Sequence, residues 1–348
     1  MVIDAKITGI KYTPFLCESL NIFSEDKFKE ALNKYANFFY NIKGHTLAIS
    51  KWVSPKRTRS YPGSRVYNTL CHSGKKITII PFVKDEGADG DRDFIQWDTI
   101  SLMSLLGVFV IVAYYSTARK NNKYANKITE QKYDIEFILT EIEKLLSYQS
   151  DALHWNIEQI NNITIPANMA KHNYYRIQNE TKVKMHSMTG IDKRIESILQ
   201  GKDEFMNISR CYAKNAQKRE VHTIQPKEKI ADGIKAQINI TNYLGGTYYL
   251  TCDEVIIKNN DIQLIEAKHT KSGKIPSIDD IKEGFIKMML FSNLKDVTVD
   301  NFILNPIPVL KLTSDDNADF IRNDLINNII REAKVNNFKL ILPDGNYL

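Results

Sequence analysis

The alternation of hydrophobic and polar residues is most regular in the last third of the chain. Two runs rich in Val, Ile, Leu, Tyr and Thr flank the polar segment 258–261, and they predict a β-hairpin. We place its turn at Asn259 and Asn260, because asparagine tolerates the positive φ that a two-residue hairpin turn requires. This turn sets Asp253 directly opposite Glu266 on the two strands.

The hairpin gathers acidic and basic side chains on one face. Side chains alternate across a strand, so Asp253, Glu266 and Lys268 share a face, whereas Glu254 falls on the other face, opposite Ile265. Directly opposed carboxylates lie about 5 Å apart at Cβ and repel each other unless a positive group separates them. A divalent cation such as Mg²⁺ is a natural occupant, because it prefers hard carboxylate oxygens.

This combination of residues suits the hydrolysis of a phosphodiester. Mg²⁺ held by Asp253 and Glu266 would keep open positions, polarise a phosphoryl oxygen and lower the pKa of a bound water. Lys268 would stabilise the developing negative charge or help to deprotonate that water. Asp253, twelve intervening residues and then Glu-Ala-Lys-His at 266–269 resemble the PD-(D/E)xK nuclease superfamily, and the Glu-Ala-Lys-His form resembles type II restriction endonucleases. Cys252 stands where the family usually has Pro.

The resemblance implies a Mg²⁺-dependent, site-specific endodeoxyribonuclease that hydrolyses double-stranded DNA. Its fold would be α/β, with a restriction-endonuclease-like core in which helices flank a mixed central sheet. The family often takes a further carboxylate from a helix before the hairpin, and Glu220 is the candidate, although a surface glutamate explains it equally well. A homodimer would supply the two active sites that cutting both strands requires. A partner DNA methyltransferase in the same cell is also implied.

The pattern after the hairpin predicts a helix and then further strands. Residues 278–291 place apolar side chains at helical spacing, and apolar runs follow at 301–304 and 307–310. The residues expected on the buried face of the helix are Ile278, Ile281, Phe285, Met288 and Met289. Hairpin, helix and strand follow one another in the order in which the nuclease core is built.

The first half of the chain predicts a separate α/β region. Helical periodicity over 25–40 and 94–106 alternates with strand patterns over 77–83 and 108–114. The acidic loop 85–93 is expected to cap the second of these helices and to interact with its dipole.

A helical region is expected to join this part to the nuclease core. Apolar residues at helical spacing continue from 128 to 160, whereas 161–205 is more polar and less periodic. The chain is therefore expected to have three parts. They are an N-terminal α/β DNA-recognition region at 1–125, a helical connector at 126–205 and the nuclease core at 206–348.

A block of basic residues lies between Lys51 and Lys76, with seven Lys or Arg, no Asp or Glu, and the aromatic residues Trp52, Tyr61 and Tyr67 among them. Each phosphate that such a block neutralises adds salt-sensitive affinity, and aromatic rings can stack on bases or pack beneath the loop. A solvated basic loop explains the block equally well when it is taken alone. Beside the nuclease motif, contact with DNA is the better interpretation. The expected DNA-binding residues are Lys56, Arg57, Arg59 and Arg65 in the block, Lys218 and Arg219 before the hairpin, and His269 after Lys268.

Composition agrees with this interpretation without requiring it. The net charge of +6 permits binding to a polyanion. The four cysteines are scattered, without zinc spacing or disulfide density, so a reducing cytoplasm is the simplest setting. The longest apolar stretch, 108–115, is too short to span a bilayer, and no membrane association is expected.

Two other functions are compatible with the same residues. The chain could be a non-cleaving DNA-binding or recognition subunit with a nuclease-like fold, or a repair or junction nuclease. An intact Asp, Glu and Lys in register favours cleavage, because a binding module has no need to hold opposed carboxylates together.

Overall fold

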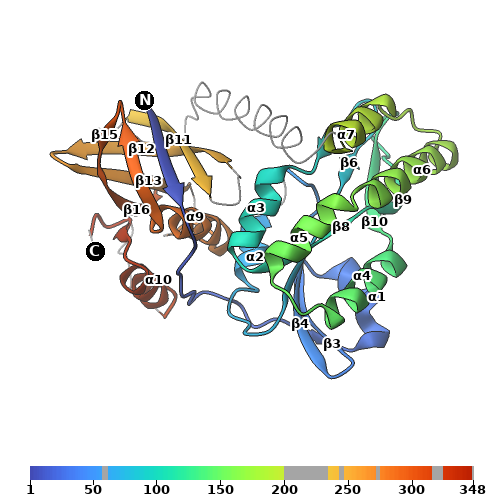
Figure 1. Ribbon diagram of the computed structural model, residues 1–348, viewed down its shortest axis with the longest axis horizontal. Helices are drawn as coiled ribbons and strands as arrows, with labels where there is room; N and C mark the ends of the chain where they lie inside the picture. Colours follow the sequence, from blue (N-terminus) through green and yellow to red (C-terminus); the bar gives the residue numbers. More distant parts are fainter. Residues whose placement is uncertain (57–61, 200–233, 243–246, 272–274, 316–323, 347–348) are drawn as a thin grey trace. The chain divides into compact units, whose positions relative to one another are not determined.

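The chain folds into two compact units. The computed structural model describes residues 1–56, 62–199, 234–242, 247–271, 275–315 and 324–346. Unit 1 combines Met1–Glu18 with Ser209–Leu348, and unit 2 is Ser19–Ile208 (Figure 1). The N-terminal strand therefore belongs with the C-terminal unit, and the helices before residue 200 belong with the first sheet. This division differs from the three parts expected from the sequence.

Unit 1 is built on a mixed sheet of eight strands in the order β15-β14-β1-β11-β12-β13-β16-β17. β1 pairs in parallel with β11, and β16 pairs in parallel with both β13 and β17, whereas the other pairs are antiparallel. The strands are β1 (Val2–Ile7), β11 (Ile234–Asn242), β12 (Thr247–Lys258), β13 (Asp261–Thr270), β14 (Leu294–Val299), β15 (Phe302–Ile303), β16 (Asn305–Ser314) and β17 (Lys339–Ile341).

The predicted hairpin is confirmed as β12 and β13. Asn259 has a φ of 56°, and the strands pair from Lys258 with Asp261 to Glu254 with Ile265. For these five pairs the register is the one that the sequence predicts, whereas the expected pair of Asp253 with Glu266 is not part of the ladder. Because side chains alternate along the paired strands, the register fixes which of them can approach the site.

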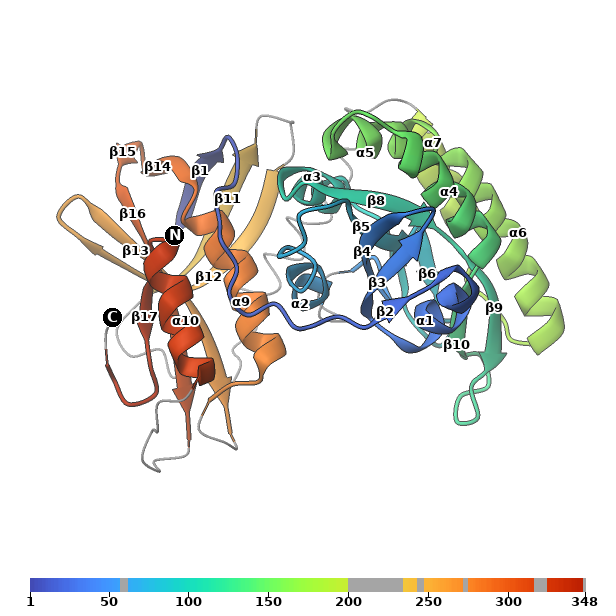
Figure 2. The ribbon, with the colours of Figure 1, turned by 90° about the horizontal axis from the view of Figure 1, so that it is seen from below.

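Two helices cover one face of this sheet: α9 (Ile278–Phe291) and α10 (Asp324–Val335) (Figure 2). The predicted helix after the hairpin is confirmed, and four of its five expected core residues are buried. Ile278 is the exception, because it lies in the first turn of α9 with 41% of its surface exposed. The expected strand at 301–304 is only the two-residue edge strand β15, and that at 307–310 is the middle of β16.

The segment after β1 is tied to α10 by buried polar contacts. Glu332 is fully buried, and its carboxylate accepts hydrogen bonds from the Tyr12 hydroxyl at 2.7 Å and from the Phe15 backbone N–H at 3.0 Å. The Asn336 side chain accepts a hydrogen bond from the Thr13 backbone and donates one to it. These bonds join residues more than 300 positions apart, so they hold the N-terminal segment within unit 1.

Unit 2 contains a five-stranded sheet in the order β2-β3-β4-β5-β8. β4, β5 and β8 are parallel neighbours, as is usual for strands connected through helices. The strands are β2 (Ile22–Phe23), β3 (Asn37–Ile42), β4 (His45–Lys51), β5 (Lys76–Pro81) and β8 (Val108–Ala113). The helical segments before β10 in this unit are η1 (Glu25–Lys27), α1 (Phe28–Lys34), α2 (Pro62–Tyr67) and α3 (Trp97–Leu105).

Two β-ribbons stand apart from this sheet. β6 (Val83–Asp85) pairs with β7 (Arg92–Phe94), and β9 (Tyr115–Lys120) pairs with β10 (Ile128–Tyr133). The helices that follow them are α4 (Ile135–Ser147), α5 (Ala152–Asn161), α6 (Thr164–Thr181) and α7 (Thr189–Leu199).

Two expectations for this unit are wrong in part. The helix expected over 25–40 ends at Lys34, because Phe38, Tyr40 and Ile42 alternate into the core as strand β3. The helical pattern over 128–160 begins with β10 and is broken between α4 and α5. By contrast, the segment 161–205, which the sequence places in a helical connector, is mainly helical up to residue 199, as α6 and α7.

The open edge of β8 is covered by side chains from α5. Asn156 accepts the Val110 N–H at 2.7 Å and donates to the Val108 carbonyl, while the Trp155 indole donates to the Val110 carbonyl at 2.7 Å. Gln159 accepts the Val112 N–H at 3.1 Å. These bonds occupy backbone groups of an edge strand that could otherwise pair with another chain.

No helix in the described ranges is long and apolar enough to cross a membrane.

We predict that Glu332→Ala lowers the free energy of unfolding by about 2 kcal/mol, because two donors lose a buried acceptor. Chemical denaturation monitored by circular dichroism measures the change. Lys334→Ala, at an exposed position of the same helix, is the control and should shift stability by less than about 0.5 kcal/mol. Equal losses in the two variants would contradict the assigned role of Glu332.

Candidate active site on the β12–β13 hairpin

A β-bulge in β12 shapes the candidate site. The pairing of β12 with β11 shifts register between the pairs Ile234–Val255 and Ala236–Cys252. On the other side, the ladder with β13 ends at Glu254, and the Asp253 carboxylate accepts the Ala267 N–H at 2.9 Å. The extra residue thus brings the Asp253 side chain against β13. It binds there at Ala267, the residue between Glu266 and Lys268. Bulges often aim side chains at functional sites in this way.

Glu266 is a buried carboxylate held by two ammonium groups. Its side chain is 2% exposed, with Lys268 Nζ at 3.0 Å from Oε1 and Lys287 Nζ at 2.6 Å from Oε2. Burial alone would raise the pKa of Glu266, but Lys287 and Lys268 outweigh it and lower this pKa to about 2. Glu266 is therefore an anion at neutral pH and can act as a metal ligand.

Lys268 is the predicted catalytic lysine. Burial lowers its pKa, but the carboxylate of Glu266 outweighs burial, Asp253 adds to the effect, and the pKa is raised. Its side chain remains 23% exposed, so the ammonium is both charged and partly open to solvent. A fixed positive charge of this kind can stabilise negative charge that develops on a phosphate.

Lys287 is a member of the site that the sequence analysis did not identify. It lies on α9 and also donates to the Thr251 carbonyl at 3.1 Å, so it joins α9 to both strands of the hairpin. The signal in the sequence is its position beside the apolar face formed by Phe285 and Met288. At this border the Lys287 ammonium reaches a buried carboxylate, which the hairpin supplies.

Gly284 permits the close approach of α9 to β13 and β16. A Cβ at this position would lie 2.8 Å from Leu310 Cδ1 and 3.6 Å from Lys268 Cε. A side chain at this position would therefore displace Leu310, whereas the stem of Lys268 would remain at an ordinary van der Waals distance.

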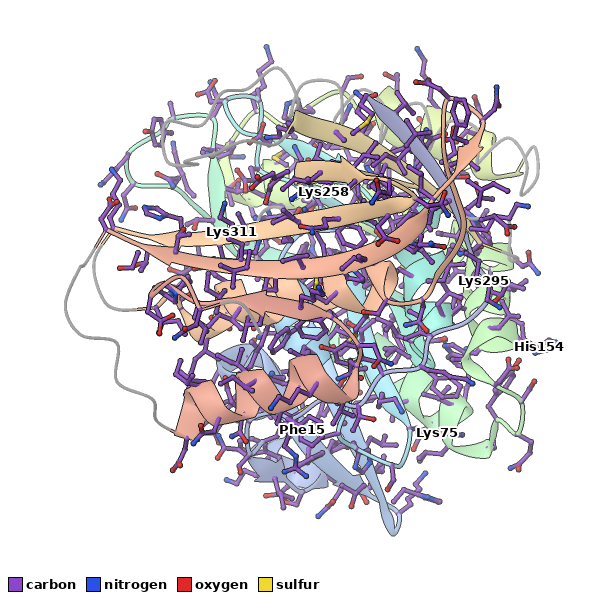
Figure 3. All side chains as sticks on the ribbon, turned by 90° about the vertical axis from the view of Figure 1, so that its left-hand side faces the viewer. Phe15, Lys75, His154, Lys258, Lys295 and Lys311 are labelled. Atoms are coloured by element: carbon purple, nitrogen blue, oxygen red, sulfur yellow. The ribbon has the colours of Figure 1, made fainter. Side chains whose placement is uncertain are left out.

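The opposite face of the hairpin carries a separate ion pair. Glu254 is buried beside Ile265 and accepts from Lys311, which Figure 3 labels on β16, at 3.1 Å. This agrees with the sequence prediction that Glu254 points away from the site. His269 bonds to Thr313 through Nδ1 at 3.0 Å, a contact that anchors its ring to β16.

The oxygen atoms of the site suit a hard cation such as Mg²⁺. Asp253 and Glu266 supply carboxylates, and Thr251 supplies a carbonyl that already accepts from an ammonium group. Among the described residues there is no group of three His, Cys, Asp or Glu side chains that could hold a metal. A cation would thus rest on two carboxylates, backbone oxygens and water. The third ligand expected from the sequence, Glu220, lies outside the described residues.

Within the described ranges, two lysines of the basic block bind backbone carbonyls at the ends of helices. Lys51 donates to the Leu32 carbonyl at the end of α1, and burial together with Arg65 lowers its pKa to about 8. Lys75 donates to the carbonyls of Leu145 and Tyr148 at the end of α4. Cations at helix C-termini stabilise the helix dipole.

The aromatic residues of the block do not all remain available for stacking. Trp52 and Tyr67 are buried. Their rings therefore pack beneath the loop and are not available to stack on bases. Lys56 lies 4.0 Å from Asp93, and the Arg65 guanidinium donates to the Lys51 carbonyl at 3.0 Å. Several expected residues lie outside the described ranges, namely Arg57, Arg59, Tyr61, Lys218 and Arg219.

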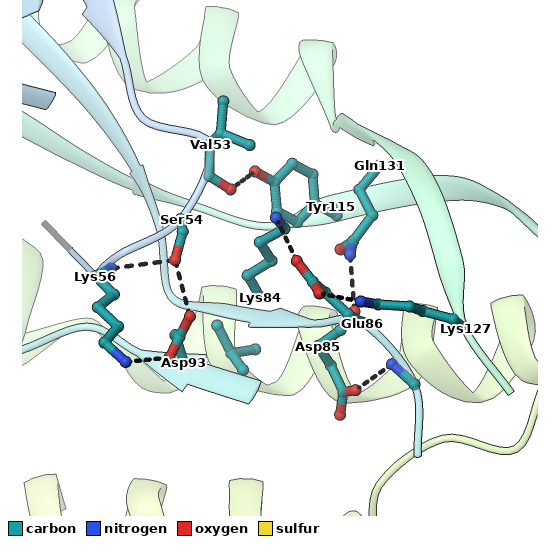
Figure 4. Close-up of polar contacts among 12 residues, drawn as sticks. Val53, Ser54, Lys56, Lys84, Asp85, Glu86, Asp93, Tyr115, Lys127 and Gln131 are labelled. Carbon is teal, nitrogen blue, oxygen red and sulfur yellow. Dashed lines mark hydrogen bonds and ion pairs between the residues drawn. The ribbon is translucent and has the colours of Figure 1, made fainter. Parts of the chain in front are cut away.

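The acidic loop does not cap α3, contrary to expectation. The N-cap residue of α3 is Gln96, without a side-chain capping bond. Asp85 instead accepts from Gly87 and lies 2.8 Å from the ring of His186. Figure 4 shows the other contacts: Glu86 pairs with Lys84 and Lys127, and Asp93 accepts from Ser54 and pairs with Lys56. Carboxylates of the loop therefore pair with lysine side chains of neighbouring segments.

We predict that the free energy of unfolding falls by about 2 kcal/mol between about pH 6 and pH 3 through Glu266 alone. The pKa of Glu266 in the folded chain, about 2, lies below its ordinary value of 4.5, so its stabilisation is present above about pH 4.5 and is lost as the pH falls toward 2. Denaturant unfolding in EDTA measures this dependence.

Glu266→Gln should lack this part of the pH dependence, whereas Glu136→Gln, at an exposed position, should retain it. The same pH profile in wild type and Glu266→Gln would show that the two ammonium groups do not hold the carboxylate ionised.

No protein-family model matches the chain, and neither a curated protein nor a solved structure is found to be similar to it.

Proposed function

We propose that the chain is a Mg²⁺-dependent endodeoxyribonuclease that hydrolyses phosphodiester bonds of double-stranded DNA. The observation that carries the proposal is the meeting of Asp253, Glu266 and Lys268 at one buried position. Two carboxylates and an ammonium group are costly to bury together, and a structural hairpin has no need of them. Metal-assisted hydrolysis of a phosphodiester can use carboxylates to hold the ion and an ammonium group to stabilise the developing charge.

The fold around the hairpin agrees with the PD-(D/E)xK resemblance. The hairpin is followed by helix α9 and then by β16, which lies parallel to β13. On this basis we propose that unit 1 is a restriction-endonuclease-like core. We propose also that it acts as a homodimer on a specific DNA site, with a DNA methyltransferase as its partner in the cell.

Each side chain has a defined task in the proposed reaction. Asp253 and Glu266 would hold Mg²⁺, which supplies polarisation of the phosphoryl oxygen and an acidified water when it is bound. Lys268 would place its ammonium beside the scissile phosphate and stabilise the charge that develops there. Lys287 holds Glu266 ionised and fixes the distance of α9 from the hairpin.

One observation favours a second candidate function. Glu266 already has an ammonium group on each oxygen, so the site is electrically satisfied without a metal. A recognition subunit that binds DNA without cutting it would tolerate this arrangement. The two candidates differ in whether Mg²⁺ and Lys268 matter for anything beyond stability.

We predict that the purified chain cuts unmethylated plasmid and phage DNA into discrete fragments with Mg²⁺ and not with EDTA. Glu266→Gln should abolish cutting, because a metal ligand is lost. Lys268→Met should slow it by about 10²- to 10³-fold, the usual effect of removing one charge-stabilising donor. Gel electrophoresis of timed reactions measures both effects.

Lys258→Met is the matched control, because this exposed lysine lies in the same hairpin beside the turn. It should cut like the wild type. If the wild type binds DNA but leaves it uncut, and Glu266→Gln binds equally well, the nuclease proposal fails and the recognition subunit takes its place.

A further inference from the structure

The β9–β10 ribbon of unit 2 is a strongly cationic element that the basic-block prediction did not include. Between Tyr115 and Tyr133 there are five Lys or Arg and a single acidic residue, Glu130. The two strands form a sheet of their own, separate from the five-stranded sheet. In Figure 2 the loop that joins them projects away from the rest of unit 2.

Four of the five cations of the ribbon are exposed, and Lys127 is half-buried. Arg119 pairs with Glu130 at 3.3 Å, and Lys127 pairs with Glu86 at the base of the ribbon. Three further lysines are exposed and have no carboxylate partner among the described residues. They are Lys120, Lys123 and Lys132.

The tip of the ribbon is preorganised by its own side chains. The Asn121 side chain accepts the backbone N–H groups of Lys123 and Tyr124 at 2.8 and 3.2 Å, and its backbone N–H donates to the Lys127 carbonyl. Tyr124 remains 56% exposed, with the Lys127 ammonium 5.6 Å from its ring centroid. A fixed loop loses less entropy when it binds a partner than a flexible one does.

The acidic loop braces the base of the ribbon. The Ile128 N–H donates to the Glu86 carbonyl at 2.9 Å, and the Asn126 N–H donates to the Asp89 carboxylate at 3.2 Å. On the other strand, Arg176 of α6 donates to the Ser116 carbonyl at 2.6 Å. The acidic groups near the ribbon are thus engaged at its base or with Arg119, which leaves the tip positive.

We propose that the β9–β10 ribbon enters the major groove of double-stranded DNA and supplies much of the affinity of unit 2. The major groove admits a two-stranded β-ribbon, and lysine, arginine and asparagine side chains can contact phosphates and base edges there. This ribbon proposal depends on the proposed nuclease function in one respect, the choice of duplex DNA as the partner. The charge, exposure and rigidity of the ribbon are independent of the hairpin site.

The test compares two triple variants that remove the same charge from unit 2. The ribbon variant is Lys120→Ala with Lys123→Ala and Lys132→Ala. The control variant changes three exposed lysines elsewhere in the unit, Lys27→Ala with Lys29→Ala and Lys193→Ala. Binding to a fluorescent duplex of random sequence is measured by anisotropy in EDTA, over a range of salt concentrations.

The ribbon variant should bind about tenfold or more weakly at about 0.15 M salt, and its salt slope should fall by about 2 to 3, because each lost phosphate contact removes about 0.9 from the slope. The control variant should bind like the wild type. Protection of guanine N7, a major-groove atom, from dimethyl sulfate should weaken in the ribbon variant alone.

Equal affinity and slope in the ribbon variant and the wild type would overturn the proposal, as would a wild type that binds no duplex DNA or that prefers single strands or RNA. A wild type that binds no duplex DNA would also contradict the nuclease proposal, whereas the other results are separate from it. A chain that binds through the ribbon but never cuts contradicts only the nuclease, and a chain that cuts with an unimpaired ribbon variant contradicts only the ribbon.

Discussion

The burial of the Glu266 carboxylate constrains much of unit 1. An ionised group in the interior costs several kcal/mol unless charged partners and hydrogen bonds compensate it. Lys268 and Lys287 provide that compensation from β13 and from α9. The helix must therefore lie close to the sheet, and Gly284 is the position at which a Cβ would lie only 2.8 Å from Leu310 Cδ1.

The bulge in β12 positions Asp253, the second carboxylate of the same site. A regular strand would leave Asp253 in the ladder, where only its backbone could bond to β13. The bulge lets its carboxylate accept the Ala267 N–H, so the acidic group lies beside Glu266 and Lys268. Strand register, helix position and bulge thus converge on one cluster of charges, as expected when a fold is built around a functional site.

The sequence predicted the features that depend on neighbouring residues. The hairpin, its turn and its register follow from strand alternation and from the positive φ of Asn259, and the helix after it follows from apolar spacing. Lys287 was missed because its partner Glu266 is distant in sequence, and its position beside the apolar face of the helix does not identify that partner. Residues 35–40 were assigned to a helix because Phe38 fits both periods, and only the pairing of β3 with β4 decides between them.

The most direct test of the account is whether the hairpin binds a divalent cation. Electron paramagnetic resonance of Mn²⁺ added to the purified chain measures free and bound ion without DNA or turnover. The account predicts a bound ion in the wild type that Mg²⁺ displaces and that Glu266→Gln and Asp253→Asn both lose. Binding that is absent from the wild type, or unchanged in both variants, would contradict it.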